Sequence, residues 1–315
     1  MADDLVECRV PTCRRPELLR RALRSLQAQT HANWRAVVLD DSPEREGRAV
    51  VAALADPRVE YRPNPHPLLA TGNLDQAFQT APLAGGQYAF VLEDDNAIEA
   101  GFMQTGLRRL ARGDLFIVSF NQRSVRFDGH GSAIPIGDLR PPTVAEQIWT
   151  RDRLWLNAFL TVSLPNGGYF WRLGRGVDLT VGTGVREPQL QECIRQTCVA
   201  AIALVPEPYS IWSYLPPANV RRQVVSHRRF ATTLNALSKR IVSQMGEARL
   251  CEAARRDADP GLLLRVNRSL AELSLMPPRH WRHFFRAPLA AVRLWLRHQL
   301  HPTAPPLDRI VYPAP

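Results

Sequence analysis

Clustered carboxylates follow two apolar segments of the chain. Residues 93–96 read Glu-Asp-Asp-Asn and come directly after the apolar segment 88–92, while Asp40 and Asp41 follow the apolar segment 36–39. Adjacent carboxylates repel one another unless a cation or a hydrogen-bond donor neutralises them. A hard divalent ion can do so when it is held by one or two carboxylates and completed by phosphates and water. For one cluster alone, a solvated loop is the alternative interpretation.

The order of the predicted elements brings the two clusters together. Residues 5–10 are apolar enough for a first strand that Pro11 would end, and Pro16 would begin a helix with an apolar stripe. A second strand (34–39), a helix (48–54), a short strand (59–61), a helix (73–80) and the strand ending at Leu92 follow. This alternation predicts a doubly wound, mostly parallel α/β sheet flanked by helices. Ligands of such sheets bind at the carboxyl ends of the strands, so both clusters should face one site.

Beyond residue 115 the pattern is less regular. Residues 116–120 predict a buried strand, 153–160 fit either a strand or a short helix, and 188–197 fit a helix with Pro188 in its first turn. The run 165–168, Pro-Asn-Gly-Gly, is a strong turn signal. After residue 216 the chain becomes arginine-rich and predicts a C-terminal α-helical extension. In its segment 279–300 aromatic residues share one helical face with arginines opposite, which suits either a membrane surface or packing against the rest of the protein.

Composition suggests three parts. The chain has 315 residues, of which 45% are hydrophobic, and a formal net charge of +10, enough for a sizeable core. The excess positive charge lies in the C-terminal third. We therefore divide the chain into 1–120, 121–215 and a basic helical extension, 216–315.

The N-terminal sequence and the cysteines favour the cytoplasm. The chain begins Met-Ala-Asp-Asp, without the basic and then apolar profile of a signal peptide. Its five cysteines lack the CxxC spacing of a zinc or redox site, which favours reduced thiols. No segment approaches the ~20 apolar residues that cross a bilayer. We expect a cytoplasmic protein, with peripheral membrane contact through 279–300 left open.

Several blocks of sequence, in this order, resemble the family 2 glycosyltransferases, which adopt the GT-A fold. The resemblance covers residues 5 to about 105, weakens between 160 and 195, and is absent after about 215. The blocks that carry it are Val-Pro-Thr-Cys-Arg-Arg-Pro-Glu-Leu-Leu (10–19), Ala-Leu-Arg-Ser-Leu-Gln-Ala-Gln-Thr (22–30), Val-Val-Leu-Asp-Asp-Ser (37–42), Asn73, Gly-Gln-Tyr (86–88) and Leu-Glu-Asp-Asp-Asn (92–96).

The resemblance assigns roles to residues of the first half. It implies that residues 1–120 bind a nucleotide sugar and that the run 93–95 is a DxD-like motif. Asp95, with Glu93, would bind a divalent cation, Mn²⁺ or Mg²⁺, beneath the diphosphate. The implied nucleotide-sugar-binding residues are Pro11, Thr12, Arg14, Asp41, Asn73 and Asp94. Of these, Pro11, Thr12 and Asp41 would hold the nucleobase, and a carboxylate at Asp41 can accept the imide N–H of uracil or thymine.

Residues 121–215 should contain the acceptor side and the catalytic base. The family's base motif aligns with residues 186–190, which places Glu187 at the position of the base, although two motif positions differ. Glu192 and Asp178 are the other carboxylates considered. Tyr169 and Trp171 could stack on an acceptor sugar, or they could simply pack in the core. Displacement assisted by one base would invert the anomeric configuration.

The resemblance therefore implies an inverting, metal-dependent glycosyltransferase. It would move one sugar from a UDP- or dTDP-linked donor to a hydroxyl of a small molecule, glycan or lipid-linked acceptor. The membrane helices and Gln-x-x-Arg-Trp motif of processive synthases are missing, so single transfer is favoured. One alternative is a degenerate GT-A-like protein that docks on membrane or RNA through its basic helices. Another is a sugar-phosphate nucleotidyltransferase, which would usually show a glycine-rich phosphate loop. The leading hypothesis involves no nucleic acid and leaves homodimer formation open.

Overall fold

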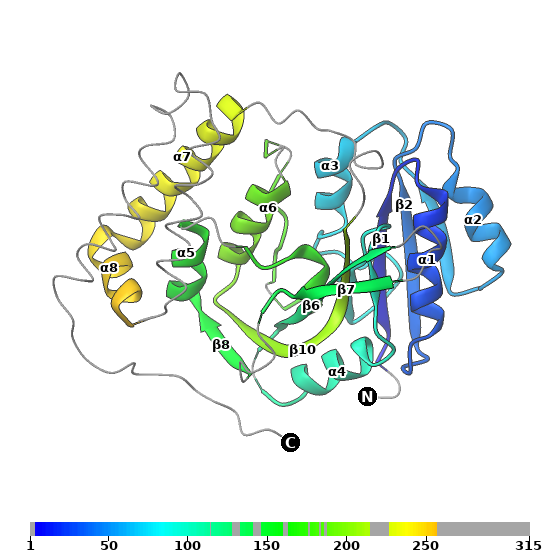
Figure 1. The fold of residues 1–315 in the computed structure, drawn as a ribbon, viewed down its shortest axis with the longest axis horizontal. Coiled ribbons are helices and arrows are strands. Elements are labelled where there is room, and N and C mark those ends of the chain that lie inside the picture. Colours follow the sequence, from blue (N-terminus) through cyan, green and yellow to red (C-terminus); the bar gives the residue numbers. More distant parts are fainter. Residues whose placement is uncertain are drawn as a thin grey trace.

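A mixed β-sheet flanked by helices forms the body of the molecule (Figure 1). The computed structural model describes residues 4–113, 115–127, 133–140, 146–159, 163–175, 177–182, 184–185, 188–214 and 227–256. Within them ten strands belong to one sheet, whose main path runs β3-β2-β1-β4-β9-β6-β10-β5. The predicted α/β class with a helix-flanked sheet is confirmed.

The first half of the sheet is parallel, as expected. Strands β3, β2, β1 and β4 lie side by side in that order and all pairs among them are parallel. The helices expected at Pro16 and near residue 48 are present, whereas the helix expected from residue 73 begins earlier. The elements are β1 (Val6–Thr12), α1 (Pro16–Gln27), β2 (Trp34–Asp40), α2 (Gly47–Leu54), β3 (Val59–Pro63), α3 (Leu69–Gln76) and β4 (Tyr88–Val91).

Strand β1 does not stop at Pro11, contrary to the sequence-based expectation. It continues to Thr12, paired with Asp40 of β2. On the opposite side of β1, the last hydrogen bond to the β4 segment is donated by the N–H of Leu92 to the carbonyl of Arg9, at 3.0 Å. Alternate residues of a parallel strand face alternate neighbours, so the missing N–H of Pro11 faces the side where β4 has already left the sheet. A proline is tolerated at such a position.

The second half of the sheet mixes strand directions. Strand β9 (Tyr169–Arg172) runs antiparallel between β4 and β6 (Ile117–Phe127), so the sheet is mixed rather than mostly parallel. Strand β10 (Ala201–Tyr214) is parallel to β6. The remaining strands are β5 (Ala97–Ile98) and β8 (Gln147–Thr150), both antiparallel to β10, and β7 (Ala133–Asp138), antiparallel to β6.

Aromatic side chains of β9 fill the core on both faces of the sheet. Phe170 packs with Phe102 of α4 (Phe102–Leu110), at 6.0 Å between ring centroids. Trp171 points to the other face and stacks on Phe78, which follows α3, at 5.5 Å. Successive residues of a strand face opposite sides, which explains this division. Helix α4 therefore covers one face, and the segment that follows α3 covers the other.

Four of the described helices lie on the other side of α3 from α1 and α2, with α6 nearest to α3 (Figure 1). They are α5 (Arg151–Phe159), α6 (Pro188–Arg195), α7 (His227–Met245) and α8 (Glu247–Arg256). The segment 153–160, left open between strand and helix, is mostly α-helix. A second apolar cluster joins these helices through residues such as Phe159, Leu237 and Leu250. The predicted segment 279–300 lies outside the described residues. No helix among the described residues has the length and hydropathy needed to span a membrane.

Candidate active site

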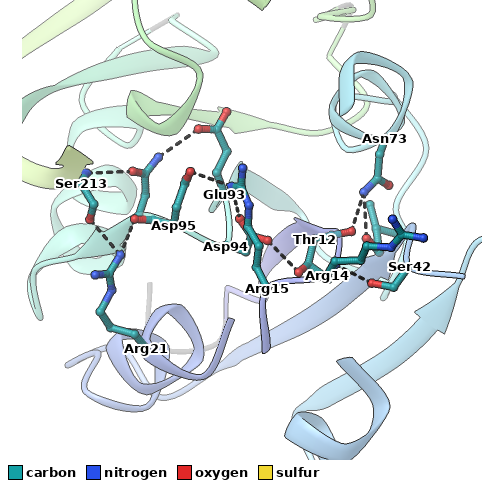
Figure 2. A network of polar contacts seen from close by, with 12 residues as sticks. Thr12, Arg14, Arg15, Arg21, Ser42, Asn73, Glu93, Asp94, Asp95 and Ser213 are labelled. Atoms are coloured by element: carbon teal, nitrogen blue, oxygen red, sulfur yellow. Dashed lines mark hydrogen bonds and ion pairs between the residues drawn. The ribbon is translucent and has the colours of Figure 1, made fainter. Parts of the chain in front are cut away.

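A single arginine bridges two carboxylates of the acidic loop that follows β4. Nη1 of Arg15 donates to Oδ1 of Asp94 at 3.2 Å and to Oδ2 of Asp95 at 2.9 Å (Figure 2). Arg15 immediately precedes α1, whose first residue is Pro16. The guanidinium therefore lies where a cation shared by both carboxylates would lie, and it offsets the repulsion between them.

The ends of β1 and β2 meet this acidic loop. The Thr12 hydroxyl donates to Oδ2 of Asp94 at 2.7 Å, and the backbone N–H of Asp41 donates to the carbonyl of Thr12 at 2.9 Å. The side-chain amide of Asn73 donates to the same carbonyl at 3.2 Å (Figure 2). The expectation that both acidic clusters lie at one edge of the sheet is confirmed.

Asp40 and Asp41 differ in their partners. Asp40 is buried and accepts hydrogen bonds from the backbone N–H of Ser42 and Gly47 and from the hydroxyl of Tyr61. These contacts fix the start of α2. Asp41 accepts hydrogen bonds from the backbone N–H groups of Leu68 and Leu69 and from the amide of Asn64, at 2.8–2.9 Å. The segment before α3 is thus fastened to the carboxylate predicted to hold the nucleobase.

Two predicted donor-binding side chains have other contacts in the structure. The side chain of Arg14 points to Glu44 at the surface, at 3.3 Å, while its backbone N–H donates to Ser42. Its neighbour Arg15, which the sequence analysis did not select, instead donates to the carboxylates of the acidic loop. The amide of Asn73 also donates to the carbonyl of Leu39, so this side chain joins the ends of β1 and β2.

Burial disfavours the charged form of two carboxyl groups in the acidic loop. Burial raises the pKa of Glu93 to about 8, with the carboxylates of Asp95 and Glu192 adding to the shift. Burial and the neighbouring Asp95 likewise raise the pKa of Asp94 to about 6, although Arg15 and Thr12 oppose the shift. A carboxyl group with such a pKa is readily stabilised by an additional cation.

The carboxylates of this loop suit Mg²⁺ or Mn²⁺ if the substrate supplies further ligands. No group of three or more His, Cys, Asp or Glu side chains among the described residues is arranged to hold a metal. These ions, however, are usually bound by one or two carboxylates and completed by substrate phosphates. Asp94 and Asp95 already share one cationic nitrogen, so the residues fit a metal that also contacts the substrate. Glu93 was expected to bind the cation together with Asp95, and this stays a prediction. In the structure its Oε2 accepts a hydrogen bond from the side-chain amide of Asn96 at 3.0 Å.

A buried network on α6, not selected as part of the site from the sequence, connects the two halves of the site. Arg195 is fully buried and donates to Oδ1 of Asp75 in α3 at 3.1 Å and to the carbonyl of Leu179 at 2.9 Å. It also donates to the side-chain oxygen of Asn166 in the Pro-Asn-Gly-Gly turn. Asp75 in turn accepts the backbone N–H groups of residues 181 and 182, both at 2.8 Å. The network fixes α6 and the segment 179–182 beside α3.

The carboxylates considered as bases are in different situations. Glu187 lies outside the described residues. Glu192 of α6 accepts a hydrogen bond from the hydroxyl of Ser163 at 2.7 Å and from the backbone N–H of Asn166 at 3.2 Å. Burial raises its pKa, and it lies close enough to Glu93 to raise the pKa of that group. Asp178 bonds Thr180 in its own exposed turn.

The structure contradicts the predicted stacking role of Tyr169 and Trp171. The exposed fractions of these residues are 0% and 1%, so neither ring presents a face to an acceptor sugar. Both pack against Phe78 in the core, the alternative that the sequence analysis left open. The reason is that the segment following α3 covers the face of the sheet on which both rings lie.

A family model and a curated relative each match part of this chain. Residues 9–155 match the model of the family described as Glycosyl transferase family 2. WcaA of Escherichia coli (strain K12), assigned by its name to colanic acid biosynthesis as a glycosyl transferase, is 31% identical over 94 residues, or 29% of this chain and 33% of WcaA. The chain thus matches about a third of the length of this relative.

Solved structures show the fold. The crystal structure of S. aureus TarS 1-349 in complex with UDP matches 92% of this chain and 80% of its own, with a TM-score of 0.61 and 13% identity. The complex of the same protein with UDP-GlcNAc matches 92% of this chain and 89% of its own, with a TM-score of 0.58 and 14% identity. The chain therefore has a GT-A-like α/β fold.

Proposed function

Because residues 9–155 match the family 2 glycosyltransferase model, we propose that the chain is a glycosyltransferase. It would move one sugar from a UDP- or dTDP-linked donor to an acceptor hydroxyl, with inversion and with a divalent cation. The observation that supports this most is the convergence of Thr12, Asp41 and the Asp94–Asp95 pair at one sheet edge. That edge combines a carboxylate suited to a base imide with carboxylates suited to a cation beneath a diphosphate. The family match favours glycosyl transfer over a nucleotidyltransferase and over a binding protein without activity.

In this proposal the chain's own residues position the donor. The end of β1 and Asp41 hold the nucleobase, and Asp94 orients the ribose side of the site. A divalent cation held by Asp95 and Asp94 would offset the charge that develops on the diphosphate as it leaves. The acceptor oxygen loses its proton to a carboxylate and bonds to the anomeric carbon while the bond to the diphosphate oxygen breaks. One displacement of this kind inverts the anomeric configuration.

We propose Glu187 as the base, because it immediately precedes α6, the helix that the Arg195 network fixes against α3. A positioned base typically contributes about 10²–10⁴-fold to the rate. Glu192 serves a different purpose in this scheme: its two hydrogen bonds to Ser163 and Asn166 hold the turn at 165–168 under the acidic loop. We also propose that the acceptor hydroxyl belongs to a small molecule, a glycan or a lipid-linked compound. The proposed location of the protein is the cytoplasm.

The first experiment identifies the donor. Nucleotide sugars are screened for thermal stabilisation of the full chain with Mn²⁺ present, since a ligand that binds the native state raises apparent stability. Release of nucleoside diphosphate from the best donor is then measured. We expect Asp95→Ala to abolish Mn²⁺-dependent release and Glu60→Gln, at an exposed ion pair with Arg62, to retain it. If no donor stabilises the protein and none is turned over, the proposal is wrong.

The second experiment tests the base. Glu187→Gln should leave donor binding unchanged and lower transfer by at least about 10²-fold. Glu192→Gln should affect the folding stability more than the chemistry, because its carboxylate accepts protein hydrogen bonds. Full activity of the Glu187→Gln variant would refute the assignment of the base.

A further inference from the structure

Arg15 and Arg21 both reach the acidic loop, but they are held differently. Arg21 donates to the backbone carbonyl of Asp95 and to the hydroxyl of Ser213, and its guanidinium stacks on Phe127 at 4.2 Å. Its contacts therefore include a backbone atom, a hydroxyl and an aromatic ring, none of which a metal ion would displace. The side-chain contacts described for Arg15 are its two bonds to the carboxylates.

The side chain of Arg15 has room to move. It is 31% exposed, whereas that of Asp94 is 6% exposed, and its backbone is anchored where α1 begins. A change of side-chain rotamer would release both carboxylates at once, because a single nitrogen, Nη1, makes both contacts. A divalent cation placed on the same two oxygens would repel the guanidinium strongly. Arg15 and the cation are therefore competitors for one position.

We propose that Arg15 is the counter-ion of the Asp94–Asp95 pair in the free enzyme, and that it yields this position to the divalent cation and then binds the donor's diphosphate. This inference rests on the proposed function. The planar guanidinium presents donors in a fork that matches phosphate oxygens. The exchange keeps the buried carboxylates neutralised before the donor arrives, and it adds a positive charge beside the diphosphate afterwards.

The first test measures Mn²⁺ binding to the full chain without any donor, by the electron paramagnetic resonance signal of free Mn²⁺. Arg15→Gln removes the competitor and should bind Mn²⁺ about tenfold more tightly than the natural protein, as expected for loss of a charge-assisted contact. Arg15→Lys, which keeps the charge but not the fork, should be intermediate. Arg20→Gln is the matched control, because Arg20 lies on the same helix and pairs with the exposed Glu17; its affinity should be unchanged.

Tighter binding cannot result from a damaged fold, so this gain separates competition from a structural role. Equal or weaker binding by Arg15→Gln refutes the proposal, and so does a lack of Mn²⁺ binding by every variant. The result does not depend on turnover of a nucleotide sugar, so it is distinguishable from failure of the proposed function.

The second test addresses the diphosphate. With saturating Mn²⁺, UDP and dTDP are titrated against uridine and thymidine as probes without phosphate. Arg15→Gln should weaken binding of the diphosphate by about tenfold and leave binding of the nucleoside unchanged. Unchanged affinity for the diphosphates, or a natural protein that binds neither, would refute this second step.

Discussion

The buried ion pair between Arg195 and Asp75 gives the sharpest prediction on stability. Arg195 is 0% exposed, and its guanidinium lies 3.8 Å from the ring centroid of Phe78 in addition to its bond to Asp75. Burial lowers the pKa of Arg195, and the negative charge of Asp75 opposes the shift. Replacing Arg195 by Met keeps most of the apolar volume but leaves the carboxylate of Asp75 without its buried cation.

The expected loss of folding stability depends on which groups remain buried without a partner. Breaking a buried pair by removing one member costs about 3–5 kcal/mol, so Arg195→Met should lower the free energy of unfolding by that amount. Asp75→Asn should cost about 2–3 kcal/mol, because an amide has one acceptor oxygen for two backbone N–H groups that now bond two oxygens. The double variant should cost about 1–2 kcal/mol less than the sum, since neither uncompensated charge remains.

Urea unfolding of the four proteins measures these quantities. The matched control is Arg62→Met, whose partner Glu60 is exposed, and which should cost under about 1 kcal/mol. If Arg195→Met lies within about 1 kcal/mol of the natural protein, or if the two substitutions are additive, the pair does not couple α3 to α6 as argued. Transfer activity should also fall in Arg195→Met below the unfolding temperature, because the network fixes the helix that follows the proposed base.

Three further predictions concern single side chains. The pKa of Glu93 is about 8, against an ordinary value of about 4.5. Between these pH values the native state holds a proton that the unfolded state has lost. The folding stability of the metal-free protein should therefore fall as pH rises through this window. The loss is on the order of 2 kcal/mol after allowing for the partly exposed side chain, and Glu93→Gln should remove most of it. Tyr169→Phe should be neutral within about 1 kcal/mol, since its buried hydroxyl lacks a hydrogen-bond partner in the part of the chain that the structure describes, whereas Trp171→Ala should cost about 3–5 kcal/mol. Leu69→Gly should stabilise by up to about 1 kcal/mol, because Leu69 has a left-handed φ of 63° and is 57% exposed.

Denaturant midpoints at several pH values and at constant salt check all three. An equal pH slope in Glu93→Gln would place the titrating proton elsewhere. A large loss in Tyr169→Phe would mean that the hydroxyl has a partner, such as a buried water. Destabilisation by Leu69→Gly would show that the leucine side chain, rather than its backbone, holds the segment before α3.

Local patterns were sufficient for the first half of the chain. Strands β1 and β2 are short segments that end at the polar residues Thr12 and Asp40, and β4 is a short apolar segment that leads into the acidic loop. Helix α1 has a clear helical period with Pro16 at its start. Because parallel strands present their carboxyl ends at one edge, the meeting of the two acidic clusters followed from the order of elements alone, whereas Thr12 came from the resemblance. The motifs of the resemblance lie within this half, and the family model matches residues 9–155.

Features that depend on packing between distant segments were not predicted. The apolar run at Tyr169 could be a wall of the site or a core strand, and only its pairing with β4 and β6 decides for the core. Arg195 looked like an ordinary helix residue, because its partners Asp75 and Asn166 are 120 and 29 residues away. Arg14 and Arg15 are adjacent in sequence, and the left-handed backbone of Arg14 (φ 56°) determines which side chain enters the site.

The types of group that Arg15 and Arg21 contact explain why Arg15 can exchange partners and Arg21 cannot. Arg21 bonds a backbone carbonyl and a hydroxyl between β10 and the acidic loop, so its removal would separate two segments of the fold. The side chain of Arg15, among the described residues, bonds carboxylates alone, and a divalent cation prefers the same groups. An ion that enters this site therefore displaces Arg15 and leaves the contacts of Arg21 intact. The acidic loop can change its counter-ion while its backbone stays fixed, as a site that must bind and release a charged product requires.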